Sequence, residues 1–173
     1  SAVLRRSAFS KQLGTQNSLL FYYIVKWCYI YSMDADKLNN LGYKIIGAAY
    51  EVRRILGSNL YEASYEQALQ LELELRGVHS ERQVYFPVYY KGMRLEKALR
   101  VDLLVEDKIP VELKALNFMG LREVSQILEY LKFGEFKLGY LINFKAPDFT
   151  VAKDFDYNID YLDKGIYRFV NRI

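Results

Sequence analysis

The sequence predicts one α/β domain that follows an aromatic N-terminal segment. Its 173 residues amount to about one domain on the usual scale of roughly 100–200 residues each. Hydrophobic residues make up 51% of the chain and charged residues 26%, which is typical of a globular protein. Segments with helical and with strand periodicity alternate, and no proline-rich linker or internal repeat separates them. This alternation indicates a single mixed domain.

Two amphipathic helices are expected to open the domain. Residues 36–56 carry apolar side chains at helical spacing, with Asp34 or Asp36 suited to the N-cap and Gly57 to the end of the helix. Residues 60–76 show the same periodicity and are also closed by a glycine. The two helices therefore precede all of the predicted strands.

Three strands are expected next, joined by two turns. Residues 83–90, 95–105 and 109–115 are rich in β-branched and aromatic side chains. Lys91-Gly92 and the polar stretch 106–108 separate them.

The C-terminal part predicts a third helix and two further strands. Residues 121–133 form an amphipathic segment that ends at a glycine, and residues 138–144 form an apolar run typical of a buried strand. The remainder is predicted as loop, apart from a short strand at residues 166–170.

Residues 1–32 differ from residues 33–173 and are predicted to form an aromatic-rich extension. They contain four basic and no acidic residues, so the net charge of +3 for the chain becomes −1 over residues 33–173. Their apolar run at residues 19–31, interrupted by Lys26, is shorter than the ~20 residues of a membrane span. With no signal-peptide pattern and no disulfide, we expect a cytoplasmic protein.

Two interpretations of this extension stay open. In one, Met33 is the natural start and residues 1–32 lie upstream of it. In the other, residues 1–32 form a helix or strand that packs on the domain or on a second copy. Their density of Tyr, Phe and Ile suits an interface, so the second interpretation predicts a homodimer.

The chain has too few cysteine and histidine residues for most thiol-based or imidazole-based sites. It has one cysteine, Cys28, and one histidine, His79, which excludes an internal disulfide and nearly excludes a Cys/His zinc site. We expect Cys28 to be a small buried side chain and His79 to lie on a surface turn. Catalysis would then depend on carboxylates, lysine, tyrosine or a metal with oxygen ligands.

The second predicted turn brings several charged residues together. An antiparallel hairpin centred on Asp107 pairs residues whose numbers add up to 214, so Asp102 faces Glu112. Directly opposed side chains lie ~5 Å apart at Cβ. Side chains alternate along a strand, so Arg100 and Lys114 share this face. The opposite, core-facing side is expected to carry Leu103, Val105, Val111 and Leu113.

Opposed carboxylates repel each other unless a positive charge lies between them. Lys114 could supply that charge, and so could a divalent cation such as Mg²⁺, which prefers oxygen ligands. The second arrangement suits metal-assisted phosphodiester hydrolysis. The alternative is a salt-bridge network in which Arg100 and Lys114 neutralise Asp102 and Glu112 without metal. The hairpin alone leaves both interpretations open.

Two predicted helices carry further polar groups that could reach this face. Glu62, Tyr65 and Glu66 share one face of the second helix. Gln126 and Tyr130 lie one turn apart on the third helix. These residues would add an acid, an amide and a phenol to the hairpin cluster.

The string from Gly57 to Tyr65 resembles the signature of the GxxExxY proteins. Glu62 and Tyr65 match its acid and tyrosine, whereas its glycine falls at Asn59, a residue type that tolerates a left-handed turn. The resemblance covers roughly residues 40–145. It is supported by the further segments 88–92, 100–102, 111–115, 126–131 and 138–144.

This resemblance implies a PD-(D/E)XK nuclease-like core, in which helices flank a central mixed β-sheet. Asp102 matches the aspartate of that superfamily, and Glu112-Leu-Lys114 matches its (D/E)-x-K element. Glu62 matches the acidic residue of its first core helix. Gln126 and Tyr130 resemble the QxxxY element of its exonuclease and RecB-like branch. The proline that precedes the aspartate in the superfamily motif is absent here.

The activity implied is hydrolysis of phosphodiester bonds in nucleic acid, DNA before RNA, with Mg²⁺ or Mn²⁺. The implied metal ligands are Glu62, Asp102, Glu112 and the carbonyl of Leu113. Lys114 would position or activate the attacking water and offset the charge on the phosphoryl group. Gln126 and Tyr130 would orient Lys114, water or a phosphate. Arg100 would bind phosphate or neutralise Asp102.

The alternative function is that of a catalytically inactive binding or scaffold protein with the nuclease fold. Exposed tyrosines at positions 85, 89 and 90 would then stack on bases or form a protein interface. This alternative predicts binding that does not depend on metal. A purely structural salt-bridge network remains a third interpretation.

Overall fold

The computed structural model describes residues 18–152 and 162–171, with side chains from Asp34 onward except at Lys97. The chain divides into two units, residues 1–40 and 41–173, and each is described by itself. The division into residues 1–32 and 33–173 expected from the sequence stays a prediction. Cys28 lies outside the described side chains.

The first helix in the described part of the chain, α2, runs from Ser18 to Leu56 and is longer than predicted. The expected start at Asp36 is wrong, because the helix continues unbroken through Asp34 and Asp36. Residues 18–35 contain no proline or glycine, so no helix-breaking residue separates Asp34 and Asp36 from the helical residues before them. No helix in the described part of the chain is long and apolar enough to cross a membrane.

A six-stranded mixed sheet forms the centre of the second unit, in the order β1-β2-β3-β4-β6-β5. Its strands are β1 (Ser80–Tyr90), β2 (Met93–Val105), β3 (Ile109–Lys114), β4 (Leu138–Asn143), β5 (Asp148–Val151) and β6 (Lys164–Val170). The β3–β4 and β5–β6 pairs are parallel and the other pairs antiparallel. The expected mixed sheet flanked by helices is confirmed, and β5 is a strand where loop was predicted.

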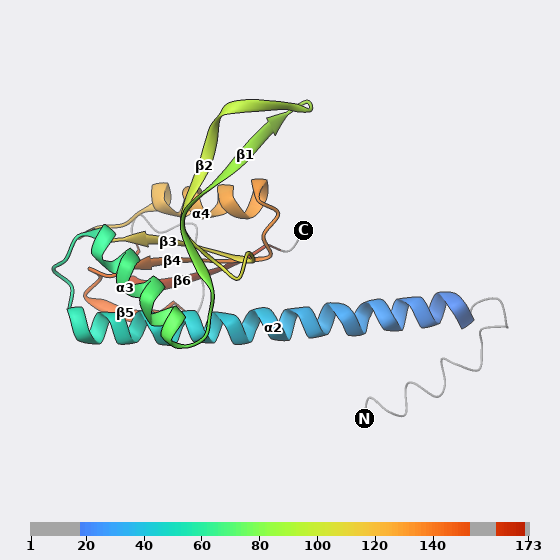
Figure 1. The fold of residues 1–173 in the computed structure, drawn as a ribbon, viewed down its shortest axis with the longest axis horizontal. Helices are drawn as coiled ribbons and strands as arrows, with labels where there is room; N and C mark the ends of the chain where they lie inside the picture. Colours follow the sequence, from blue (N-terminus) through green and yellow to red (C-terminus); the bar gives the residue numbers. More distant parts are fainter. Residues whose placement is uncertain (1–17, 153–161, 172–173) are drawn as a thin grey trace. The chain divides into compact units, whose positions relative to one another are not determined.

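Helices cover both faces of this sheet (Figure 1). On one face lie α3 (Glu62–Leu75) and residues 41–56 of α2, whose buried side chains include Ile45, Ala48 and Leu69. On the other face lies α4 (Leu121–Phe133), which has the predicted bounds. The cluster beneath α4 contains Val101, Leu104, Met119, Val124, Ile127, Tyr130, Leu131, Phe136, Leu141, Leu162, Tyr167 and Phe169.

Helix α4 packs closely on β4 because Gly139 has no side chain. A Cβ at this position would lie 3.0 Å from Ile127 Cδ1 and 3.1 Å from Leu131 Cδ2. The close approach fixes α4 on the sheet. It thereby positions the remaining side chains of α4 over β3.

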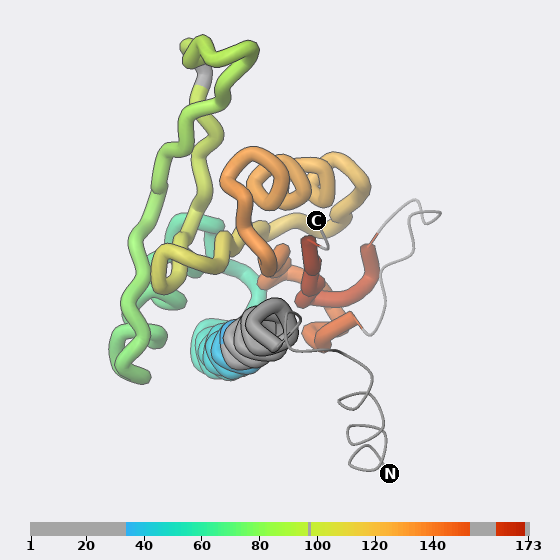
Figure 2. Tube along the Cα trace, turned by 90° about the vertical axis from the view of Figure 1, so that its right-hand side faces the viewer, coloured from blue at the N-terminus to red at the C-terminus, as the bar shows by residue number. Residues whose placement is uncertain are grey.

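The register of the β2–β3 hairpin is the predicted one. The pairs are Leu103 with Val111, Leu104 with Pro110, and Val105 with Ile109. Its turn places Glu106 and Asp107 in the left-handed region, with φ of 49° and 53°. Pairing with β3 ends at Leu103, while β2 continues its pairing with β1. The point near Leu103 where β2 and β3 separate is called the fork here. Beyond the fork, residues 84–90 of β1 and 93–101 of β2 form a two-stranded ribbon that rises past α4 (Figures 1 and 2).

Candidate active site

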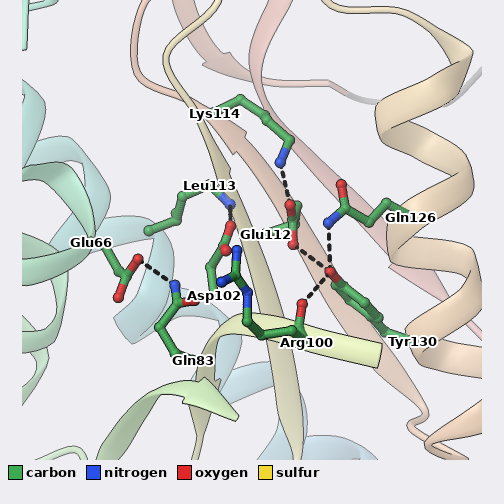
Figure 3. Close-up of polar contacts among 9 residues, drawn as sticks. All are labelled: Glu66, Gln83, Arg100, Asp102, Glu112, Leu113, Lys114, Gln126 and Tyr130. Carbon is green, nitrogen blue, oxygen red and sulfur yellow. Dashed lines mark hydrogen bonds and ion pairs between the residues drawn. The ribbon is translucent and has the colours of Figure 1, made fainter. Parts of the chain in front are cut away.

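The fork between β2 and β3 holds a carboxylate that is fixed by the backbone. Asp102 is the first residue of β2 beyond the paired segment and is 6% exposed. Its Oδ2 accepts a hydrogen bond of 2.9 Å from the backbone N–H of Leu113 (Figure 3). The carboxylate thus takes the place of a backbone carbonyl where the ladder ends. Its position is therefore set by the sheet itself.

Glu112 is fully buried beside this carboxylate. Its Oε1 forms an ion pair with Lys114 Nζ, and its Oε2 accepts a hydrogen bond of 2.9 Å from the Tyr130 hydroxyl. Burial first, and then the charge of Asp102, raises the pKa of Glu112 to about 8. Lys114 and Tyr130 oppose this rise without cancelling it. Burial and the charge of Asp102 therefore favour the protonated form of Glu112 over a wider pH range than is usual for a glutamate.

The charge state of Lys114 follows from its contact with Glu112. Burial is the largest single influence and acts to lower the pKa of the Lys114 ammonium. The combined attraction of Glu112, Glu62 and Asp102 outweighs burial, and the pKa is raised. Lys114 thus remains a cation in this arrangement. A protonated lysine can donate hydrogen bonds to a water or to a phosphate oxygen.

Helix α4 contributes the amide and the phenol that the sequence placed one turn apart. Gln126 Nε2 donates a hydrogen bond of 2.7 Å to the Tyr130 hydroxyl. That hydroxyl lies 2.6 Å from the carbonyl oxygen of Arg100 and 2.9 Å from Glu112 Oε2. A phenol has one proton, so it donates to one acceptor at a time. Burial, followed by the charge of Glu112, raises the pKa of Tyr130, which keeps this donor neutral.

Helix α3 brings two acids toward the same fork. Glu62 is the first residue of α3 and is partly buried, which raises its pKa. Lys114 and a backbone hydrogen bond from Ala115 act to lower that pKa, whereas Asp102 raises it further. The charges of Asp102 on β2 and of Lys114 on β3 therefore both act on the Glu62 carboxyl.

The second acid of α3, Glu66, has contacts that the sequence did not reveal. It is 7% exposed. Its Oε2 accepts a hydrogen bond of 2.7 Å from Gln83 Nε2, and Arg82 Nε lies 3.7 Å from its Oε1. Gln83 adopts a φ of 57°, which is uncommon for a residue other than glycine. A single glutamine at the start of a strand has no sequence signature, so only the fold identifies it.

Tyr65 secures the turn that leads into α3. Its hydroxyl donates to the Gly57 carbonyl at 2.8 Å and accepts from the Leu60 N–H at 3.2 Å. Its ring stacks on Phe144, with centroids 4.4 Å apart. The left-handed residue of this turn is Gly57, with a φ of 70°, and Asn59 is not left-handed, contrary to its expected turn role. Tyr65 therefore supports the position of Glu62.

The comparisons with known proteins agree with this geometry. A family model described as the PD-(D/E)XK nuclease superfamily matches residues 39–154, more than half of the chain. The chain belongs to the PD-(D/E)XK nuclease superfamily. No curated protein and no solved structure matched it. All site residues described above lie within the matched range.

PD-(D/E)XK nucleases are typically metal-dependent, and the donors at this fork fit a hard cation. Within the described residues, no three His, Cys, Asp or Glu side chains come together as a complete cation site. Mg²⁺ is commonly held by one or two carboxylates with water, and Asp102 and Glu112 meet that need. Burial first, and then the charge of Asp102, raises the pKa of Glu112, and a cation held between the two carboxylates would favour its ionised form. Such an ion would have to displace Lys114 from Glu112 Oε1.

His79 takes no part in this site of the PD-(D/E)XK domain. Its side chain is 62% exposed, and its Nε2 lies 3.4 Å from Glu81 Oε1. The expectation that His79 is a surface residue is confirmed.

Proposed function

We propose that this protein hydrolyses phosphodiester bonds in nucleic acid, with DNA as the first substrate and Mg²⁺ or Mn²⁺ as the cofactor. The observation that carries the proposal is the meeting of Asp102 and Glu112 at the fork, with Lys114 paired to Glu112. Superfamily membership supports the same reaction class. The match of Glu62 and Tyr65 further supports placing the chain among the GxxExxY proteins.

The residues proposed as metal ligands are Glu62, Asp102, Glu112 and the carbonyl of Leu113. A bound Mg²⁺ would stabilise the negative charge that develops on the phosphoryl group. The bond from the Leu113 N–H holds Asp102 in place. The bond from Tyr130 holds Glu112. The chain thus presents two oriented carboxylates before any ion arrives, which limits the rearrangement that binding requires.

Lys114 is proposed to act on the water and on the phosphate. Its ammonium would donate hydrogen bonds to the attacking water or to a non-bridging oxygen, which orients one and stabilises charge on the other. Gln126 is a positioning residue, because it acts through the Tyr130 hydroxyl. Arg100 lies on β2 two residues before Asp102, where the two-stranded ribbon joins the site (Figure 3). We propose that it binds the phosphate beside Asp102.

The test compares cleavage of plasmid, single-stranded DNA and RNA by the full chain in Mn²⁺, Mg²⁺ or EDTA. We expect Asp102→Asn and Lys114→Ala to lose at least about 100-fold in rate, the usual effect of removing a transition-state contact. Matched controls are Asp107→Asn and Lys108→Ala, both exposed in the hairpin turn. Thermal melting shows that each variant is folded.

The proposal fails if both site variants cleave as fast as the wild type. Binding of nucleic acid without cleavage in either metal would instead identify an inactive nuclease-fold binding protein, the alternative drawn from the sequence.

A further inference from the structure

The ribbon of β1 and β2 has one face packed on the domain and one face open. Phe86 makes an edge-to-face contact with Phe136, at 5.2 Å between centroids. Val84 and Leu99 pack against the same cluster beneath α4. Side chains alternate along a strand, so the residues next to these point away from α4. The open face therefore includes Tyr85 and its partner on β2.

Two tyrosine–arginine pairs lie across the ribbon. Tyr85 is opposite Arg100, and Tyr89 is opposite Arg94. Opposed residues share a face of the ribbon, so each tyrosine lies beside its arginine. The register of β1 and β2 shifts between Pro87 and Tyr89, so the second pair lies beyond an irregularity in the ribbon. Tyr85 is 64% exposed and Tyr89 is 60% exposed. Exposure of this extent leaves the ring faces available for stacking.

The open face continues into the active site. Arg100 lies opposite Tyr85 and two residues before Asp102 on β2, so alternation directs the Arg100 and Asp102 side chains to the same face. Figure 3 shows its guanidinium beside Asp102. From Arg94 to Asp102, β2 spans roughly 25 Å at the rise of an extended strand. Tyr85, Arg100 and Asp102 thus lie on one face that leads toward the fork, and the Tyr89–Arg94 pair lies further out on the ribbon.

Positive charge is concentrated on this ribbon. Residues 80–100 contain five basic and two acidic residues, a net charge of +3, whereas residues 33–173 as a whole have a net charge of −1. Close to the tip, Lys91 Nζ lies 5.5 Å from the ring centroid of Tyr90. A polyanion would therefore be attracted to the ribbon rather than to the acidic remainder of this unit.

We propose that the open face of the ribbon binds single-stranded nucleic acid and guides it to Asp102. The bases stack on Tyr85 and Tyr89, and the phosphates pair with Arg94 and Arg100. This inference takes its ligand class from the proposed function. Aromatic rings beside a basic track are the usual platform for single strands.

A single strand fits this face better than a duplex. In a duplex the base faces are already stacked, so exposed tyrosine rings gain little from it. Duplex readout uses Arg, Asn or Gln side chains directed at base edges in the major groove. The open face of the ribbon instead presents exposed tyrosine rings, with Arg100 opposite Tyr85.

The experiment measures anisotropy of fluorescein-labelled oligodeoxythymidine with the full chain in EDTA, so that binding is read without cleavage. We expect Tyr89→Ala and Arg94→Ala each to raise the Kd about tenfold, within the range for one base stack. Tyr89→Phe keeps the ring and should bind like the wild type. Arg94→Ala should also reduce the slope of log Kd against log salt by about 0.7. The control is Tyr43→Ala, a 73% exposed tyrosine of α2.

Each outcome separates this inference from the proposed function. Wild-type affinity in Tyr89→Ala and Arg94→Ala would overturn it, as would an absence of binding by a chain that still cleaves. Tighter binding to a matched hairpin duplex, lost in the same variants, would overturn the single-strand assignment and leave the hydrolysis proposal intact. Single-strand binding that depends on Tyr89 and Arg94, without cleavage in Mn²⁺, would support the ribbon and refute hydrolysis.

Discussion

The backbone N–H of Leu113 donates a 2.9 Å hydrogen bond to Oδ2 of Asp102. A side chain on β2 thereby completes a hydrogen bond that the β2–β3 ladder no longer supplies. Because the site carboxylate doubles as the end of the ladder, its location depends on the sheet and not on a mobile loop.

The first prediction concerns metal binding by Asp102. Calorimetry with Mn²⁺ should show saturable binding to the wild type, and Asp102→Asn should lose it. Asparagine can still accept the bond from Leu113, so the fold is expected to persist while one anionic ligand is removed. Asp107→Asn is the matched control. Equal Mn²⁺ affinity in Asp102→Asn and the wild type would exclude this carboxylate as a ligand.

The second prediction concerns Tyr130→Phe. The loss of the hydroxyl leaves Glu112 Oε2 and the amide of Gln126 without their partner. Buried groups left unpaired cost about 1–3 kcal/mol, so the free energy of unfolding in urea should fall by that amount. Cleavage should fall about 10–100-fold, as for other groups that orient a ligand.

The kinetic readout distinguishes positioning from simple destabilisation in this variant. The loss should appear in kcat at temperatures where Tyr130→Phe is fully folded, and Tyr43→Phe should behave like the wild type. A fully folded Tyr130→Phe with normal kcat would show that the phenol does not orient Glu112.

The third prediction concerns Tyr65→Phe. The change removes the bonds to Gly57 and Leu60 and keeps the stacking on Phe144. Urea denaturation should show a loss of about 1–2 kcal/mol. Because the turn before α3 loosens, Mn²⁺ binding through Glu62 should weaken as well. Tyr61→Phe, at an 87% exposed position, is the control, and unchanged stability of Tyr65→Phe would contradict the role assigned to its hydroxyl.

The fourth prediction concerns the pH dependence of stability without metal. The pKa of Glu112 is about 8 in the folded chain against an ordinary value of 4.5. Between these values the folded state binds the additional proton, so the free energy of unfolding falls as pH rises, by at most about 1.4 kcal/mol per unit. The contribution of Glu112 is fully present below pH 4.5 and is lost as pH rises through 8.

Glu112→Gln removes this titration and should show a flatter profile. The measurement is urea denaturation in EDTA between pH 5 and pH 9. The difference between variant and wild type isolates Glu112, because the other buried acids titrate in both proteins. Glu129→Gln, on the exposed side of α4, should retain the wild-type slope. Parallel profiles for Glu112→Gln and the wild type would show that Glu112 does not carry the pH dependence.

The register of the β2–β3 hairpin could be predicted from local sequence rules alone. The polar turn at residues 106–108 and alternation along each strand fix the register that pairs Leu103 with Val111. The same rules place Lys114 beside Glu112. Helical spacing alone brings Gln126 to Tyr130.

Features that depend on long-range packing were not predictable from the sequence. The start of α2 was wrong because Asp34, although suited to an N-cap, lies inside a longer helix whose preceding residues 18–33 contain no proline or glycine. The four-residue strand β5 exists only through its pairing with β6. The bond between Gln83 and Glu66 joins residues of two different elements, and no periodicity encodes such a contact.

The turn at residues 106–108 has a consequence for how this protein can vary over evolution. Side chains on a strand alternate, so insertion or deletion of one residue there would shift β3 by one position. Glu112 and Lys114 would then point into the apolar layer, and Leu113 would take their place beside Asp102. Substitutions within the turn leave this geometry intact, whereas a change in its length dismantles it. A change in the number of residues between Asp102 and Glu112 is therefore expected to damage the site as much as the loss of either acid.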